Sequence, residues 1–210
     1  EKAYWLGFIY ADGYISSRDN TFELSLALKD KEHLDKFNVF MQHENDNVKT
    51  DSFRCRWSVV NKHLWETLNN YGCTPRKSLT LKFPDESIFK SKDLIRHFIR
   101  GYFDGDGCIS YGNKEHTIPA YQILGTEEFL RAIMNHLDIN ETLFHNHNDA
   151  KSTTMFIHST NKKAMQLFHK LYDNCSIYLN RKYERFIYFC RIFEKSNIWL
   201  QINIRWRLKC

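Results

Sequence analysis

The segment AYWLGFIYADGYIS, residues 3–16, has a second version in HFIRGYFDGDGCIS, residues 97–110. A constant offset of 94 residues aligns Gly7 with Gly101 and Asp12 with Asp106 (106 − 12 = 94). Both copies are largely apolar around the helical circumference, and both end on an aspartate followed by glycine. This pattern is typical of a buried helix that ends at the Asp-Gly pair. The chain is therefore expected to hold two equivalent helices and two equivalent carboxylates.

Small residues recur four positions apart in each copy, Gly7 with Ala11 and Gly101 with Gly105. A glycine inside a helix costs about 1 kcal/mol relative to alanine, so its presence needs a reason. Small residues at this spacing make a flat strip that lets a second helix backbone approach closely. We therefore expect the two helices to pack on each other through these four positions.

Packing of that kind would bring the two aspartates together at the C-terminal ends of both helices. The negative pole of the helix dipole lies at this end, which makes it an unfavourable place for a carboxylate. A bound divalent cation would remove the conflict. The alternative is that each Asp-Gly pair is only a helix-ending turn. The recurrence of the pair in two matching contexts favours the cation site.

The stretches WLGFIYADG (residues 5–13) and IRGYFDGDG (residues 99–107) resemble the motifs of the LAGLIDADG homing endonucleases, in the single-chain form with two motifs. Tyr10 stands where the family name has an aspartate, at a variable position. The resemblance implies that the last aspartate of each motif, Asp12 and Asp106, binds the catalytic cation. It also implies that Ala11 and Gly105 contribute to the metal site.

The repetition extends beyond the motifs, with an offset that grows from 94 to about 105 residues, which indicates small insertions in the second copy. A period of this length suits a duplicated domain rather than a solenoid. In the first copy we expect helices at 3–12, 30–42 and 61–71 and strands at 14–19, 22–29, 47–52 and 54–60. In the second copy we expect helices at 94–106, 126–137 and 161–173 and strands near 108–113, 119–125, 142–147 and 153–159.

These elements predict an α+β fold made of two pseudo-symmetric αββαββα repeats. The motif helices would pack at the centre, and two antiparallel sheets would form a saddle for DNA. The expected divisions are an N-terminal repeat with its connector at 1–90, a C-terminal repeat at 91–190 and a basic, aromatic extension at 191–210. The extension could bind phosphates or could be an amphipathic helix that closes the fold.

Alternation along the predicted strands leaves one face of each sheet polar. In the first copy Leu24, Leu26 and Leu28 would point inward, as would Cys55 and Trp57. A strand ribbon that carries Arg, Lys and Ser can enter the major groove, although an ordinary solvated face would look the same. The resemblance favours DNA. The expected DNA-binding residues are Ser16, Arg18, Glu23, Ser25, Lys29, Arg54, Arg56, Ser58, Lys114, Thr154 and His158.

Cleavage of a phosphodiester requires an activated water and neutralisation of the developing charge, and two carboxylate-held Mg²⁺ ions can supply both. Mn²⁺ is expected to substitute, and Ca²⁺ to be unproductive. The family places a lysine late in each repeat, which corresponds to Lys77 and Lys182. Lys29 is a further candidate, at the expected end of the second strand. A solvated surface charge is the alternative for each lysine.

Composition agrees with this interpretation without proving it. The net charge is +5 and the pI about 8.8, moderate for a nucleic-acid binder. Residues 181–210 hold eight basic and two acidic residues, so the rest of the chain is close to neutral. Six cysteines show no metal-ligand spacing and predict free thiols in a reducing, DNA-containing compartment such as the cytoplasm. No membrane-spanning run and no secretion signal is seen.

The function expected from these features is that of a monomeric homing endonuclease, of the kind associated with intron or intein mobility, that cuts double-stranded DNA at a long asymmetric target. Three alternatives remain open. The chain could be an RNA maturase, a DNA-binding protein that lost catalysis, or a nickase that cuts one strand. Retention of both aspartates argues against lost catalysis, because an unused pair of facing carboxylates is costly.

Overall fold

A computed structural model describes residues 1–42, 47–77, 80–145 and 154–207, with side chains described up to residue 195. The first repeat contains α1 (Lys2–Asp12), β1 (Gly13–Ile15), β2 (Thr21–Ala27), η1 (Leu28–Asp30), α2 (Lys31–Phe40), β3 (Val48–Thr50), β4 (Arg54–Val60) and α3 (Lys62–Asn70). The connector holds η3 (Glu86–Ile88). The second repeat contains α4 (Lys92–Asp106), β5 (Gly107–Tyr111), β6 (Pro119–Gly125), α5 (Glu127–Leu137), β7 (Leu143–His145), β8 (Met155–Thr160), α6 (Asn161–Tyr172) and α7 (Asn180–Arg207). The predicted α+β fold with two αββαββα repeats is confirmed.

Each repeat forms one four-stranded antiparallel sheet, in the orders β1-β2-β4-β3 and β5-β6-β8-β7. Leu24 pairs with Trp57 and Leu26 with Cys55, and all four side chains are buried on the helix-facing side. This confirms the alternation predicted for β2 and β4. The second sheet pairs Ile123 with Ile157 in the same way, and both are fully buried. The opposite, uncovered face of each sheet carries exposed residues such as Arg54, Arg56 and His158.

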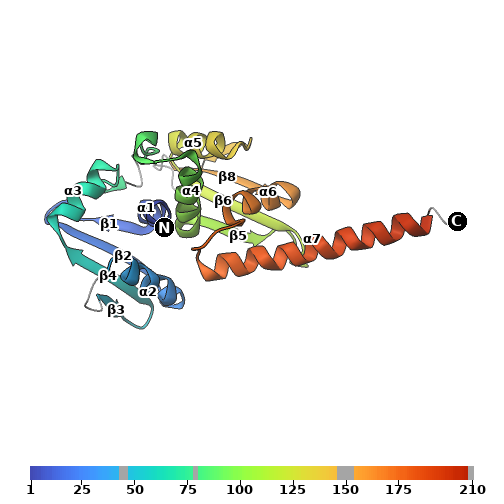
Figure 1. The fold of residues 1–210 in the computed structure, drawn as a ribbon, viewed down its shortest axis with the longest axis horizontal. Helices are drawn as coiled ribbons and strands as arrows, with labels where there is room; N and C mark the ends of the chain where they lie inside the picture. The colour runs from blue at the N-terminus through green and yellow to red at the C-terminus, as the bar shows by residue number, and fades with distance from the viewer. Residues whose placement is uncertain (43–46, 78–79, 146–153, 208–210) are drawn as a thin grey trace.

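The two motif helices lie side by side between the sheets (Figure 1). Both glycines sit against the backbone of the other helix. A Cβ atom built on Gly7 would lie 1.9 Å from the carbonyl oxygen of Phe98, and one built on Gly101 would lie 1.9 Å from that of Tyr4. The close approach predicted from the small residues is therefore present, and it is nearly symmetric.

Three strands of the first repeat, β1, β2 and β3, end earlier than predicted, and β3 ends at Thr50 instead of residue 52. β1 ends at Ile15 because the Ser16 hydroxyl accepts hydrogen bonds from the backbone N–H groups of Arg18 and Asp19, which forms a turn. β2 ends at Ala27, and the next three residues form the 3₁₀ helix η1. Leu28 is consequently 39% exposed instead of pointing into the core.

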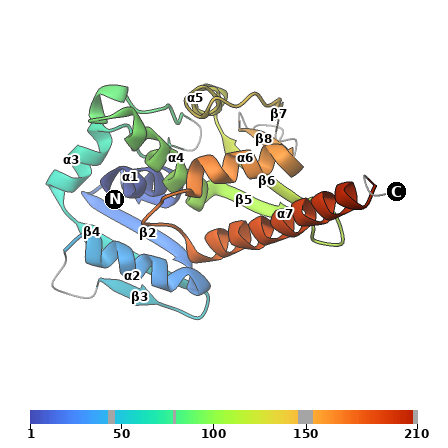
Figure 2. The ribbon, with the colours of Figure 1, turned by 45° about the vertical axis from the view of Figure 1, so that its right-hand side comes forward.

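Helix α7 crosses the boundary that the sequence suggested at residue 190. Its first half closes the second repeat, where Phe186 and Phe189 are buried against the core. The helix then continues without a break to Arg207 and extends beyond the rest of the fold (Figure 2). The basic extension is thus the end of a core helix. Residues 146–153, which include the end of the strand predicted at 142–147 and the first residue of the strand predicted at 153–159, lie outside the described residues, as does Ser78.

Candidate nuclease site

The carboxylates of Asp12 and Asp106 meet where α1 and α4 end. Burial, followed by the repulsion from Asp106, raises the pKa of Asp12 to about 6. Burial also raises the pKa of Asp106, although the Lys77 and Lys182 charges oppose the shift. The site thus holds two negative groups that the surrounding structure stabilises poorly.

Close packing of the helix ends enforces this proximity. A Cβ atom on Gly105 would lie 2.3 Å from the Ala11 Cβ and 3.1 Å from the Asp12 Oδ2. Only a residue without a side chain fits at this position. Ala11 and Gly105, predicted as metal-site residues, therefore form the close contact between the two helix ends, next to the Asp12 carboxylate.

Lys77 and Lys182 both reach the ends of the motif helices, as their matched positions in the repeats suggested. The Lys77 ammonium donates to the Gly13 carbonyl, and the Lys182 ammonium donates to the equivalent Gly107 carbonyl. Lys182 also donates to the carbonyl oxygens of Phe103 at 2.5 Å and Asp104 at 2.7 Å. Because a cation is favourable at a helix C-terminus, these lysines offset the poor placement of the carboxylates.

The position of Lys29 corrects a prediction. Lys29 lies on η1, not on a strand, and its side chain is exposed. Gly13 pairs with Leu24 and Gly107 with Ile123, so Leu24 on β2 and Ile123 on β6 are equivalent, four residues before η1 begins at Leu28 (28 − 24 = 4). Thr126 caps α5 directly in the second repeat, and η1 therefore has no counterpart there.

The chemistry of the donor set fits a hard divalent cation. The two facing carboxylates are oxygen donors with raised pKa values, and a positive ion between them would favour their ionised forms. Mg²⁺ commonly uses one or two carboxylates and fills its other positions with waters and phosphate oxygens. Within the described residues no group of three or more His, Cys, Asp or Glu side chains could hold a metal ion, so the remaining ligands would be of that kind.

A cavity of about 220 Å³ opens beside Asp106, and its walls include Lys77, Tyr102, Leu124 and Thr154. Thr154 was predicted to contact DNA from the strand at 153–159. β8 begins only at Met155, and Thr154, just before it, borders the cavity beside Asp106. Tyr102 was not predicted. Its position one helical turn before Asp106 was the available signal, because residues four apart share a helix face.

A buried polar network next to the site was also missed. The Asp104 carboxylate is fully buried and accepts hydrogen bonds from the hydroxyls of Tyr4 at 2.7 Å and Tyr172 at 2.6 Å, and from the Leu179 N–H at 2.9 Å. The Tyr4 hydroxyl also lies 3.0 Å from the His33 Nε2. The Tyr4 hydroxyl donates its only proton to Asp104, so in its contact with His33 the Tyr4 oxygen is the acceptor and the His33 Nε2–H is the donor. Burial lowers the His33 pKa to about 3 and keeps the ring neutral.

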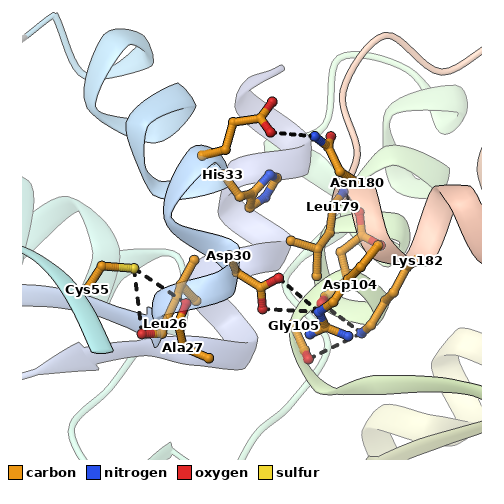
Figure 3. A network of polar contacts seen from close by, with 12 residues as sticks. Leu26, Ala27, Asp30, His33, Cys55, Asp104, Gly105, Leu179, Asn180 and Lys182 are labelled. Atoms are coloured by element: carbon orange, nitrogen blue, oxygen red, sulfur yellow. Dashed lines mark hydrogen bonds and ion pairs between the residues drawn. The ribbon is translucent and has the colours of Figure 1, made fainter. Parts of the chain in front are cut away.

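This network joins the two repeats through the hydrogen bond between Tyr4 and Asp104. Figure 3 shows the adjacent polar contacts, where Asp30 faces the start of α7 around Asn180 and Lys182. Arg181 donates to Asp30 at 2.9 Å, and Asn180 donates to Glu32 at 2.8 Å. Asp30 occupies the N-cap position of α2 but makes no capping hydrogen bond, and its carboxylate binds Arg181 instead.

The uncovered face of the first sheet is polar and basic. Glu23 lies opposite Ser58, and Ser25 lies opposite Arg56, so these side chains share one face. The Arg56 guanidinium is 3.6 Å from the Glu23 carboxylate. Arg18 and Arg54 are also exposed. Ser16 is the exception among the predicted DNA contacts, because its side chain is 7% exposed and used in the turn after β1.

The uncovered face of the second sheet has a different character. His158 is exposed and lies opposite Gln122, and Lys114 is exposed on the loop between β5 and β6. Phe144 and Phe156 stack with ring centroids 5.3 Å apart. The first sheet therefore presents arginines where the second presents a histidine, an amide and aromatic rings.

Solved structures similar to this one are homing endonucleases. I-GzeII, a LAGLIDADG homing endonuclease in complex with its DNA target, superposes with a TM-score of 0.59 at 13% identity, over 93% of this chain and 92% of that chain. I-SmaMI, a LAGLIDADG homing endonuclease bound to cleaved DNA, gives a TM-score of 0.56 at 13% identity, over 94% and 90%. The chain has the LAGLIDADG homing endonuclease fold. A profile of the family described as "LAGLIDADG-like domain" matches residues 93–172, which span the second LAGLIDADG motif.

One curated relative is a much longer protein, and the match covers only part of each chain. DNA-directed RNA polymerase subunit Rpo1C of Methanocaldococcus jannaschii is 32% identical over 116 residues, which is 53% of this chain and 13% of that protein. The chain thus spans about an eighth of the length of this relative. Among the described residues, no helix is both long enough and apolar enough to cross a membrane.

Proposed function

We propose that this chain is a divalent-metal-dependent endonuclease that cuts both strands of DNA at a specific site. The observation that carries the proposal is the meeting of Asp12 and Asp106 at the paired helix ends, under two uncovered sheet faces. Its fold relatives include I-SmaMI bound to cleaved DNA. A bound Mg²⁺ would activate water and neutralise charge on the phosphate.

The residues of the site would have different roles in DNA cleavage. Asp12 and Asp106 hold the cation, with Ala11 and Gly105 allowing the helix ends to approach. Lys77 and Lys182 balance the negative charge and fix the carbonyl groups around the carboxylates. Each aspartate would serve the cut in one strand, and the two cuts would be staggered with 3′ overhangs.

Recognition would belong to the two sheet faces, one in each of the repeats 1–90 and 91–190. Arg18, Arg54 and Arg56 would read one half-site, and Lys114 and His158 the other. Because the two faces differ in charge and shape, the preferred DNA target would be long and non-palindromic. The chain would act as a monomer, since it supplies both halves. The five described cysteines are free thiols, which suits a reducing compartment.

Incubation of the protein with a randomised plasmid library tests this proposal. With Mg²⁺ or Mn²⁺, sequencing of the cut ends should recover one long asymmetric site with staggered ends. Ca²⁺ and a chelator serve as controls and should give no cut ends. Recovery of bound but uncut DNA with every metal would instead assign the chain to a binding protein of the same fold. Nicks in one strand alone would assign it to a nickase.

A further inference from the structure

The strands of the second sheet carry no Arg, Lys, Asp or Glu. All four strands lie within the described part of the chain, and their sequences are GCISY, PAYQILG, LFH and MFIHST. The strands of the first sheet hold four charged residues, Glu23, Lys49, Arg54 and Arg56. The two sheets have equivalent strand orders, so equivalent parts of the fold present different chemistry.

The uncovered face of the second sheet is partly apolar. Phe156 pairs with Leu124 on β6 and with Phe144 on β7, and directly opposite residues of antiparallel strands share a face. Met155 and Ile157 are buried in the core, so the Phe156 side chain between them points to the uncovered face. The two phenylalanine rings are inclined by 21°, and Phe144 is 43% exposed. Leu124, Phe144 and Phe156 form what we call the apolar patch.

The apolar patch is continuous with the carboxylate site and with the polar side chains of the same face. Leu124 and Asp106 both line the cavity of about 220 Å³. Gln122 lies two residues before Leu124 on β6, and it faces His158 on β8. DNA bound at Asp106 and along this face would therefore meet the apolar patch and Gln122.

The major groove distinguishes base pairs by groups that match these side chains. Thymine presents a methyl group that packs against phenylalanine, and adenine accepts and donates hydrogen bonds to a glutamine amide. A G·C pair against the apolar patch would bury polar base edges without partners, which is unfavourable. Arginine instead pairs with guanine, and a carboxylate accepts from the cytosine amino group. The first sheet holds both groups, because the Arg56 guanidinium lies 3.6 Å from the Glu23 carboxylate.

We infer that the two halves of the DNA target differ in base composition. The half-site on the second sheet is rich in A·T pairs, with thymine methyl groups against the apolar patch and adenine at Gln122. The half-site on the first sheet is rich in G·C pairs. This inference rests on the proposed function for its DNA ligand, but it concerns binding and requires no cleavage.

The test begins with selection of bound duplexes from a randomised pool in the presence of a chelator. The first half-site is the half in which Arg56→Ala weakens the base preference. Thymines in each half of the selected target are then replaced by uracil, which lacks the methyl group and keeps every hydrogen-bonding group. Fluorescence anisotropy measures the Kd of each duplex for the wild type and the variants.

Selection should recover an A·T-rich second half-site and a G·C-rich first half-site. Uracil in the second half-site should weaken binding about fourfold for each contacted methyl group, and uracil in the first should have little effect. Phe156→Ala should abolish the response to uracil. Phe53→Ala is the matched control, because it removes a phenylalanine of the first repeat that is 82% exposed, and it should keep the response.

Three results would overturn the inference: a G·C-rich second half-site, equal effects of uracil in both halves, or a response to uracil that survives Phe156→Ala. A target that is bound as expected but never cut with Mg²⁺ would refute the proposed nuclease function alone. A pool in which no duplex is enriched would refute both.

Discussion

At the scale of single residues, the proposed site consists of the Asp12 and Asp106 carboxylates, which lie where neither negative charge is well stabilised. Burial and mutual repulsion raise the pKa of Asp12 from 3.8 to about 6. Between pH 4 and 6 the folded protein therefore holds more protons than the unfolded chain. The free energy of unfolding should fall as the pH rises across this interval and remain lower at neutral pH.

Asp12→Asn should consequently raise the free energy of unfolding at pH 7.5 in the absence of metal. Roughly two pKa units correspond to a gain on the order of 1–3 kcal/mol, and the gain should disappear near pH 4. Urea unfolding at the two pH values measures it. Asp19→Asn is the control, because hydrogen bonds lower the pKa of Asp19 and the substitution removes a favourable group. A stabilisation that did not change with pH would contradict the assigned pKa.

The repeated Asp-Gly signal pointed to both aspartates, and the resemblance to the LAGLIDADG homing endonucleases pointed to Lys77 and Lys182. The structure places all four at the ends of the motif helices. Asp104 and Tyr102 could not be found this way. Their partners Tyr172 and Leu124 lie far away in the sequence, and the first repeat has Tyr10 and Phe8 at the equivalent positions. A repeat comparison finds what two copies share and misses what only one copy has.

At the scale of elements, the backbone contact between α1 and α4 holds the site together. Gly101→Ala should destabilise the protein by at least about 3 kcal/mol, because the new Cβ would lie 1.9 Å from a backbone oxygen that cannot move away. Gly125→Ala is the matched control, since its Cβ would lie 3.4 Å from the nearest side chains. Thermal unfolding compares the two. Equal melting temperatures would mean that the helices do not pack through Gly101.

The end of α4 depends on Lys182 in the same way. Lys182→Met should lower the free energy of unfolding by about 2–4 kcal/mol, because the substitution leaves several buried carbonyl groups without a hydrogen-bond donor. Lys170 also donates to carbonyls at the end of a helix, α5, but its side chain is partly exposed, so water can replace it. Lys170→Met should therefore cost under about 1 kcal/mol. Equal losses of unfolding free energy in the two variants would mean that Lys182 stabilises the end of α4 no more than Lys170 stabilises the end of α5.

Periodicity predicted the order of the helices and strands because apolar and polar positions alternate cleanly in β2 and β4. It gave both ends of β4 and β6 correctly but placed the ends of β1, β2 and β3 too late in the chain. The turn after β1 depends on the Ser16 hydroxyl, and η1 is an insertion present in one repeat only. The continuous α7 was also missed, because its buried half and its basic half look different in sequence.

At the scale of the whole molecule, the two sheet faces are related in position but differ in chemistry. Arg56→Ala should weaken base discrimination in one half-site by about 1–3 kcal/mol, because a bidentate contact to guanine would be lost. Arg131→Ala, which removes an equal charge from the exposed side of α5, is the control. Selection from a randomised target measures both. A uniform loss of affinity for all sequences would assign Arg56 to a phosphate contact.

The most direct measurement is cleavage of the selected DNA target by Asp12→Asn and Asp106→Asn, with Asp93→Asn at the other end of α4 as the control. Each of the first two variants should lose double-strand cleavage with Mg²⁺ and keep DNA affinity within about tenfold of the wild type, because the carboxylates act on the cation and water. Asp93→Asn should cut normally. Double-strand cleavage at the wild-type rate by either motif variant would contradict a nuclease site built from the paired aspartates.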